Sequence, residues 1–268
     1  IIFQPAEEGG AGAKRMREEG VLELEPKPSY AFGMHVWPTL QSGQIGFRSG
    51  PMLSAADMFT FIIEGRGGHA AWPHLNNDPI VATSAIVMAV QTLISRKINP
   101  LESGVVSITQ FDAGDGAHNV IPHQALIRGT IRALSDEALL QLREGLLHIV
   151  STTAIAHGCK VASSTFALDH YPVTMNDDTL YPFAAKVAGL ISNSGEHSIV
   201  DPVMGAEDFA FLAQGVPSAF FFLGQGGKDN ENNGKEEDGD SSCGECGGRV
   251  PTNLNLHHPK FNLDEDIL

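Results

Sequence analysis

Two adjacent carboxylates near the start of the chain are the first residues that suggest chemistry. Glu7 and Glu8 follow the apolar run IIFQP, which predicts a short strand ended by Pro5. Adjacent acids repel each other, and a divalent metal ion relieves that repulsion: one carboxylate ligates the ion while the other moves a proton. The same pair also suits the first turn of a helix, where acids favour the positive end of the helix dipole.

Histidines in two later segments add nitrogen ligands to these oxygens. His35 lies in the predicted strand FGMHVWP, and His257 precedes Pro259 in LHHPKF. Glu8, His35 and His257 together make a set of one oxygen and two nitrogens that suits zinc or manganese. A lone histidine in an apolar run is more often a core residue whose ring nitrogens are satisfied by hydrogen bonds.

Three polar residues of the central segment are candidates for contacting a substrate. His69 lies in the glycine-rich turn GRGGHAAWPH, Asn119 in the turn HNVIP, and Arg132 near a strand end in RGTIRAL. Amide and guanidinium groups are suited to holding a carboxylate. Taken by spacing alone, the three are also compatible with a turn histidine, a turn amide and a surface cation without a role.

Composition excludes several classes of protein. The 268 residues allow one or two domains, and 42% hydrophobic residues is typical of a globular protein. With 17 basic and 32 acidic residues, the net charge of -15 argues against nucleic acid and anionic membrane surfaces as partners. No apolar run is long enough for a membrane span. No targeting segment is visible, so the compartment is left open, with the cytoplasm as the default.

An acidic segment at residues 225–250 differs from the rest of the chain. It is almost free of apolar residues, which predicts a flexible insertion. It holds Cys243 and Cys246 in an isolated CGEC, a weak signal for a metal or redox site. With Cys159 the cysteines number 3, and this odd count does not predict a disulfide scaffold.

Residues 55–168 predict an ordered series of strand, helix, strand, strand, helix and strand. Asp78 and Ser135 are suited to capping the two helices. In the second helix apolar residues recur at helical spacing, at Leu139, Leu142, Leu146 and Ile149. This order is that of a split βαβ unit, which indicates a small ferredoxin-like domain inserted into a larger α/β domain formed by residues 1–54 and 169–268.

Seven motifs occur in the order seen in a known family. They are IFQPAEEGGAGAKRM, FGMHVWP, GRGGHAAWPH, NVIP, GTIRAL, GAEDF and LHHPKF. The chain thereby resembles the aminoacylase-like metal-dependent amidohydrolases, which include hippurate hydrolase, N-acyl-amino-acid amidohydrolases and indole-acetyl-amino-acid hydrolases. The resemblance implies an α/β, zinc-peptidase-like catalytic domain with an inserted four-stranded α+β dimerisation (lid) domain, and a homodimer formed through residues 55–168.

The resemblance also implies roles for the candidate residues. Glu7 is expected to be the general base and His69 a second catalytic residue that reaches a substrate carbonyl. Glu8, His35 and His257 are expected to ligate metal in a site for two divalent ions, manganese or zinc. Asn119 and Arg132 are expected to bind substrate, an N-acyl amino acid. Glu207 in GAEDF resembles a wall of the site whose role stays open.

One expected segment is missing from this sequence. Family members carry a CGHDxH-type segment upstream of the glutamate pair that supplies further metal ligands, whereas this chain begins at Ile1. We therefore expect an N-terminally truncated fragment that binds metal weakly and is inactive alone. Two alternatives to the amidohydrolase stay open: a non-catalytic dimerising or ligand-binding homologue, and a small-peptide metallopeptidase.

Overall fold

Residues 1–114, 116–226 and 256 are the part of the chain that the computed structural model describes. His257, both cysteines of CGEC and nearly all of the acidic insertion 225–250 lie outside these residues. The chain divides into two units, and each contains three separate segments. The first unit comprises Ile1–Lys27, Pro51–Thr174 and Pro202–Gly215, and the second comprises Pro28–Gly50, Met175–Asp201 and Val216–Leu268.

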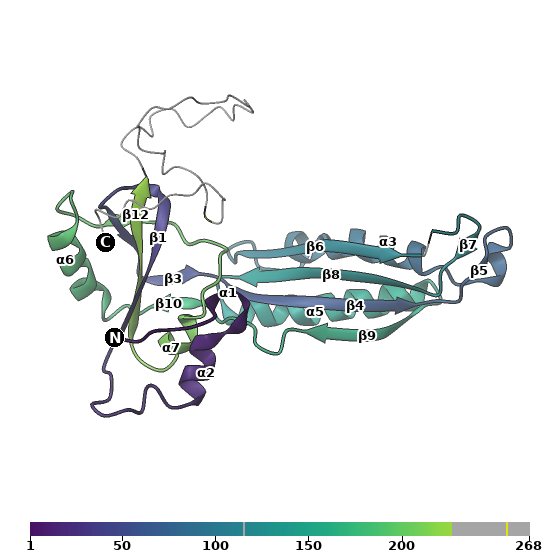
Figure 1. Ribbon diagram of the computed structural model, residues 1–268. Coiled ribbons are helices and arrows are strands. Elements are labelled where there is room, and N and C mark those ends of the chain that lie inside the picture. The colour runs from purple at the N-terminus through teal and green to yellow at the C-terminus, as the bar shows by residue number, and fades with distance from the viewer. Residues whose placement is uncertain (115, 227–255, 257–268) are drawn as a thin grey trace, which may run out of the picture. The chain divides into compact units, whose positions relative to one another are not determined.

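An antiparallel four-stranded sheet is the centre of the first unit (Figure 1). Its strands, in the order β6-β8-β4-β9, are β6 (Gly104–Ala113), β8 (Gln124–Ala133), β4 (Ala55–Glu64) and β9 (Lys160–Phe166). The helices α3 (Pro79–Val90), α4 (Thr92–Arg96) and α5 (Asp136–Ala156) pack against it. The predicted order of strands and helices is confirmed, and the predicted insert 55–168 lies wholly within this unit.

Buried side chains alternate with more exposed ones along β4 and β8, and the buried set forms the core of this unit. Every second residue of β4 from Ala55 to Ile63 is buried, and β8 shows the same alternation. These side chains meet the apolar stripe of α5, where Leu139, Leu142 and Leu146 are at most 1% exposed. A strand with one face against helices requires this alternation with a period of two residues.

Both predicted helix caps are present. The Asp78 carboxylate accepts a hydrogen bond from Ile80 N at 2.8 Å at the start of α3. The Ser135 hydroxyl accepts one from Ala138 N at 3.1 Å at the start of α5. Each cap satisfies an amide that the first turn of a helix leaves without a partner.

A mixed sheet forms the second unit. Its order is β1-β12-β2-β11, from β1 (Ala31–Gln41), β12 (Ser218–Gly226), β2 (Ile45–Phe47) and β11 (Ser198–Ile199). β1 runs parallel to β12, and β2 is antiparallel to β12 and parallel to β11. With α6 (Tyr181–Ile191), this arrangement confirms the predicted α/β class.

The expected end of the first long strand at Pro38 is wrong. β1 continues to Gln41, and its register to β12 shifts between Trp37 and Gln41. Proline has no amide hydrogen to donate, and it is tolerated here because β1 is an edge strand and Pro38 lies in an irregularity of the register.

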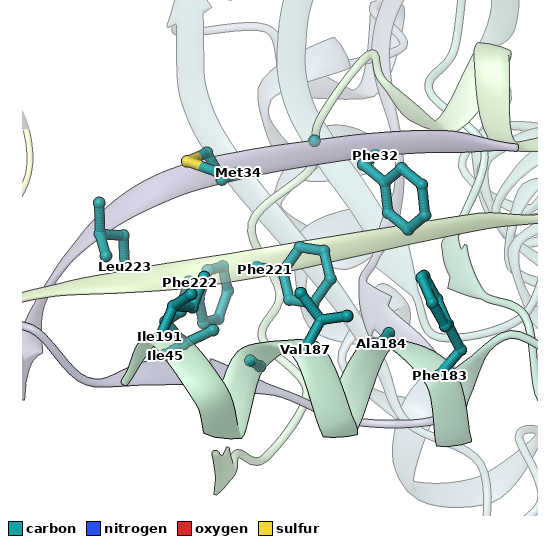
Figure 2. Close-up of a pocket in the computed structure, with 12 residues that line it drawn as sticks. Phe32, Met34, Ile45, Phe183, Ala184, Val187, Ile191, Phe221, Phe222 and Leu223 are labelled. Atoms are coloured by element: carbon teal, nitrogen blue, oxygen red, sulfur yellow. The ribbon is translucent and has the colours of Figure 1, made fainter. Parts of the chain in front are cut away.

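An apolar pocket of about 330 Å³ lies in the second unit between this sheet and α6 (Figure 2). Phe32 of β1 and Phe221 of β12 point into it opposite Phe183 and Val187 of α6, as Figure 2 shows. Phe32 is 52% exposed and Phe183 is 59% exposed. The second unit therefore keeps part of its apolar surface open within the described residues.

The remaining elements are short. They are α1 (Glu7–Gly10), α2 (Gly12–Glu18), β3 (Gly50–Leu53), β5 (Gly68–His69), the 3-10 helix η1 (Pro73–Leu75), β7 (Val120–Ile121), β10 (Thr174–Asn176) and α7 (Ala210–Ala213). The predicted strand at residues 1–5 is wrong, because that segment forms no strand. Among the described residues, no helix is both long and apolar enough to span a membrane.

Candidate metal and catalytic site

The glutamate pair lies in a single irregular helical turn. α1 contains Glu7 and Glu8, and its backbone departs from helical angles at Glu8 and at Gly9, where φ is 100°. The flanking residues Ala6 and Ala11 have φ of 56° and 46°, in the left-handed region. The first-turn interpretation of the pair is thus met only in part, since the turn does not continue as a regular helix.

Folding brings Glu7 to two acids from the far end of the sequence. Ligand oxygens of Glu7, Glu207 and Asp208 all lie within 4.8 Å of one another. Glu207 is 7% exposed and Asp208 is fully buried. Burial, and then the charge of Glu7, raise the pKa of Glu207 to about 7. A bound proton or a cation would reduce the repulsion among these three carboxylates, and the distances between their oxygens suit either one.

Hydrogen bonds fix Asp208 in this cluster. Its carboxylate accepts from Ala13 N at 2.9 Å and from the side-chain amide of Gln4. Burial raises the pKa of Asp208, while these two hydrogen bonds act in the opposite direction. Asp208 therefore fastens residues 4 and 13, on both sides of Glu7, to the segment that precedes α7. Its neighbour Glu207 was singled out by the motif GAEDF, whereas Asp208 was missed.

His35 has one ring nitrogen hydrogen-bonded to a backbone carbonyl. It lies on β1 in the second unit, half-buried, with its Nδ1 2.7 Å from the carbonyl oxygen of Val36. A carbonyl oxygen only accepts, so Nδ1 carries the hydrogen, and in the neutral ring Nε2 has the lone pair. Metal-bound histidines commonly donate their second nitrogen to a carbonyl in this way.

The carboxylates of Glu7, Glu207 and Asp208 fit a divalent cation, although the described residues hold only part of the predicted set. Carboxylates and a neutral imidazole are ligands that manganese and zinc accept. Glu8 is exposed beside the carboxylate cluster in the first unit, and His35 lies in the second unit. His257 lies outside the described residues.

His69 and Asn119 are brought together at the far end of the four-stranded sheet. β5 pairs with β7, and Ala70 N donates to the carbonyl of Asn119 at 2.9 Å. The Nδ1 of His69 accepts from Ala71 N at 3.1 Å, so in the neutral ring Nε2 carries the hydrogen. The Trp72 ring lies 4.8 Å from the imidazole, centroid to centroid. His69 is thus an exposed hydrogen-bond donor.

Arg132 lies at the opposite end of that sheet. It pairs with Ala56 at the start of β4, and its Nη1 donates to the carbonyl of Met204 at 2.6 Å. Because β4 runs from Ala55 to Glu64, the two ends are about 30 Å apart. Arg132 therefore lies near the segment that carries Glu207, and not near His69.

The sequence profile of Peptidase family M20/M25/M40 matches residues 1–247 of the chain. The chain belongs to this family. IAA-amino acid hydrolase ILR1-like 4 of Arabidopsis thaliana is 40% identical over 270 residues, covering 100% of this chain and 56% of that protein. N-acetylcysteine deacetylase of Bacillus subtilis is 36% identical, covering 100% of this chain and 62% of that protein. Thermostable carboxypeptidase 2 of Saccharolobus solfataricus is 35% identical with the same coverages of 100% and 62%.

Solved structures agree with this assignment. A dinuclear metal binding peptidase of family M20 from Bacillus subtilis superposes with a TM-score of 0.69 at 31% identity, over 99% of this chain and 59% of that chain. A protein from methicillin resistant Staphylococcus aureus superposes with a TM-score of 0.79 at 32% identity, over 98% of this chain and 61% of that chain. The α/β fold of the family is therefore present, and the chain spans 56% to 62% of the length of the curated relatives named above.

Proposed function

We propose that the natural protein containing this chain hydrolyses the amide bond of N-acyl or aryl-acyl amino acids. The observation that carries the proposal is the position of Glu7, which lies beside the expected ligand Glu8 and within 4.8 Å of the buried Glu207 and Asp208. The similarity to an IAA-amino acid hydrolase and to N-acetylcysteine deacetylase supports this substrate class.

In this proposal Glu8, His35 and His257 hold metal in a site for two divalent ions, manganese or zinc. A metal ion held by these residues would polarise the substrate carbonyl and lower the pKa of a bound water. A carboxylate oxygen of Glu7 accepts a proton from the attacking water, and Glu7 later gives this proton to the leaving nitrogen. Burial and the charge of Glu7 raise the pKa of Glu207 to about 7, and protonation of Glu207 limits the repulsion on an ionised Glu7.

His69 is proposed to donate its Nε2 hydrogen to the oxygen that gains charge in the transition state. The length of β4 separates His69 from the end of the sheet where Tyr171 pairs with Ala56 and contacts Glu7. This separation of about 30 Å supports the proposal that His69 acts in the site of a second copy, within a homodimer formed through residues 55–168. In the same proposal that segment is an inserted domain, residues 1–54 and 169–268 form the catalytic domain, and Asn119 and Arg132 bind substrate.

A panel of substrates tests the reaction. N-acetyl, benzoyl and indole-acetyl amino acids are compared with dipeptides, with manganese or zinc added and with a chelator as the control. We expect amino acid release that depends on metal and falls by about 10²–10⁴-fold in Glu7→Gln. Glu64→Gln serves as the matched variant and keeps full activity, because Glu64 lies at the last residue of β4 with its side chain 44% exposed.

The panel also separates the alternatives. Preference for dipeptides favours a small-peptide metallopeptidase, an alternative supported by the similarity to a thermostable carboxypeptidase. Absence of metal-dependent release by the natural protein favours a non-catalytic homologue. We further propose that residues 1–268 alone bind metal weakly and are inactive, because this sequence lacks the CGHDxH-type ligands. Metal-dependent release by purified residues 1–268 contradicts that part of the proposal.

A further inference from the structure

The turn that carries Glu7 has a backbone that is unfavourable by itself. Ala6 and Ala11 both lie in the left-handed region, at φ of 56° and 46°, although each has a Cβ atom. L-residues other than glycine adopt this region at an energetic cost, and they remain there only where surrounding groups hold them. Within the turn, Gly10 N donates a hydrogen bond to the carbonyl of Ala6.

The hydroxyl group of Tyr171 contacts this turn at three points. It donates to the carbonyl of Glu7 at 2.6 Å, and it accepts from Gly9 N and Ala11 N at 3.3 Å each. A phenol has one hydrogen to donate and two lone pairs with which to accept, so these contacts use its full capacity. One side chain from position 171 thereby fastens the main chain on both sides of Glu8.

Tyr171 is itself attached to the rigid part of the first unit. Its amide and carbonyl exchange two hydrogen bonds with Ala56 of β4, each 2.9 Å long. Its ring packs edge-on against Phe211 of α7, with the centroids 5.9 Å apart. Tyr171 therefore connects the turn, through its hydroxyl, to two other elements. Its main chain is bonded to the central strand β4, and its ring contacts α7, the helix that follows Glu207.

We propose that Tyr171 is a positioning residue for Glu7. By holding the main chain of residues 7–11, its hydroxyl keeps the Glu7 carboxylate beside Glu207 and Asp208, where it meets the attacking water. The inference rests on the proposed function only in assigning the proton transfer to Glu7. If Tyr171 only stabilised the fold, its substitution would accelerate hydrogen exchange throughout the chain, whereas a positioning role predicts faster exchange only near Glu7 and a lower kcat.

Tyr171→Phe is the test variant, since it keeps the ring and removes the hydroxyl. Tyr181→Phe is the matched control, because the Tyr181 hydroxyl bonds to His197 in the second unit at 2.9 Å. We expect hydrogen exchange over residues 6–13 to be about tenfold faster in Tyr171→Phe and unchanged in Tyr181→Phe, with residues 55–64 unchanged in both. Unchanged exchange over residues 6–13, or equal acceleration throughout the chain, overturns the proposal.

Phe211→Leu distinguishes hydrogen bonding from packing. It alters the ring contact and keeps the hydroxyl of Tyr171, so exchange over residues 6–13 is expected to stay slow. Should both Tyr171→Phe and Phe211→Leu accelerate exchange equally, the effect belongs to packing and the proposal is overturned.

Kinetics of the natural protein test the consequence for Glu7. In Tyr171→Phe we expect kcat to fall by about 10-fold to 100-fold while KM stays within about twofold, because a base is misplaced and the rest of the substrate contacts remain. Glu7→Gln is expected to lower kcat less in the Tyr171→Phe background than in the wild type. Equal effects of Glu7→Gln in both backgrounds, or an unchanged kcat, contradict the inference.

The two proposals fail in different ways. If the wild-type protein releases no amino acid from any substrate, the proposed function fails, and the exchange of residues 6–13 still decides whether Tyr171 holds the turn. If the wild type is active and Tyr171→Phe changes neither exchange nor kcat, the proposed function stands and the inference fails.

Discussion

The strand β4 carries polar groups at both ends, and the two ends differ in burial. Near its start, Asp57 is 2% exposed and its carboxylate has an ion pair and two amide donors. At its other end the Glu64 side chain is 44% exposed, and the exposed His69 lies just beyond it. We call these the buried end and the open end of β4.

This difference determines what each end contributes. A buried charge has lost its water and depends on the protein groups that replace it, so its removal affects folding. An exposed group keeps its water and contributes little to stability, and it is available to molecules outside the chain. Removal of the buried Asp57 is therefore expected to act on folding, and removal of the exposed His69 on turnover.

The largest effect is expected for Asp57→Ala at the buried end. The Oδ2 of Asp57 lies 3.2 Å from Arg143 Nη1, and its Oδ1 accepts from Met58 N at 2.7 Å and Ala167 N at 3.0 Å. Removing the carboxylate leaves the half-buried Arg143 guanidinium and two amides without their partner, at a cost of about 3–5 kcal/mol. Urea unfolding followed by circular dichroism measures the loss, and a loss below about 1 kcal/mol contradicts the assignment.

His69→Ala at the open end is expected to lower turnover and leave folding intact. If His69 stabilises developing charge, hydrolysis by the natural protein falls by about 10²–10³-fold. The free energy of unfolding is expected to change by less than about 0.5 kcal/mol, because the side chain is exposed. His148→Ala, an exposed histidine on α5, is the control and should retain activity. Equal losses in both variants argue against a specific role.

The two helix caps are expected to contribute equally to stability at both ends of β4. Asp78 caps α3 near the open end and Ser135 caps α5 beyond β8, and both are half-buried. Asp78→Ala and Ser135→Ala should each lower the free energy of unfolding by about 0.5–2 kcal/mol, since capping is a local effect. Thermal unfolding of the two variants measures this, and a severalfold difference between them implies that position in the sheet matters more than the cap.

The smallest effect is expected for Glu64→Ala. Its carboxylate lies 2.8 Å from Lys160 Nζ, with the two side chains 44% and 69% exposed. We expect a loss of about 0–1 kcal/mol that disappears at high salt, because water and ions screen an exposed pair. Unfolding measured at low and high sodium chloride gives the answer. A larger loss that persists in salt would remove the distinction between the two ends.

Local patterns predicted most of the elements correctly. The alternation in β4, the spacing of Leu139, Leu142 and Leu146, and the caps at Asp78 and Ser135 depend on residues a few positions apart. Such signals report backbone preference and the face that must be buried. The prediction failed at residues 1–5, where an apolar run forms no strand and Gln4 instead bonds to Asp208.

For the candidate site as well, the sequence identified some residues and missed the contacts that hold them. Residue type and motif singled out Glu7, Glu8, His35 and His69, and identified Glu207 without a role. Sequence gave no indication that Asp208 fixes the segments around Glu7, or that the hydroxyl of Tyr171 fastens residues 7–11. It also did not reveal that His69 and Arg132 lie at opposite ends of one sheet.

The reason is physical. The capacity of a carboxylate to ligate metal or to move a proton belongs to the side chain, and periodicity belongs to neighbouring residues, so both can be read along the chain. Which carboxylates meet, and which of them lose their water, depends on the packing of segments that are distant in sequence. Glu7 and Glu207 repel each other as charges, and they lie together in segments that the hydrogen bonds of Asp208 and Tyr171 connect to the rest of the first unit.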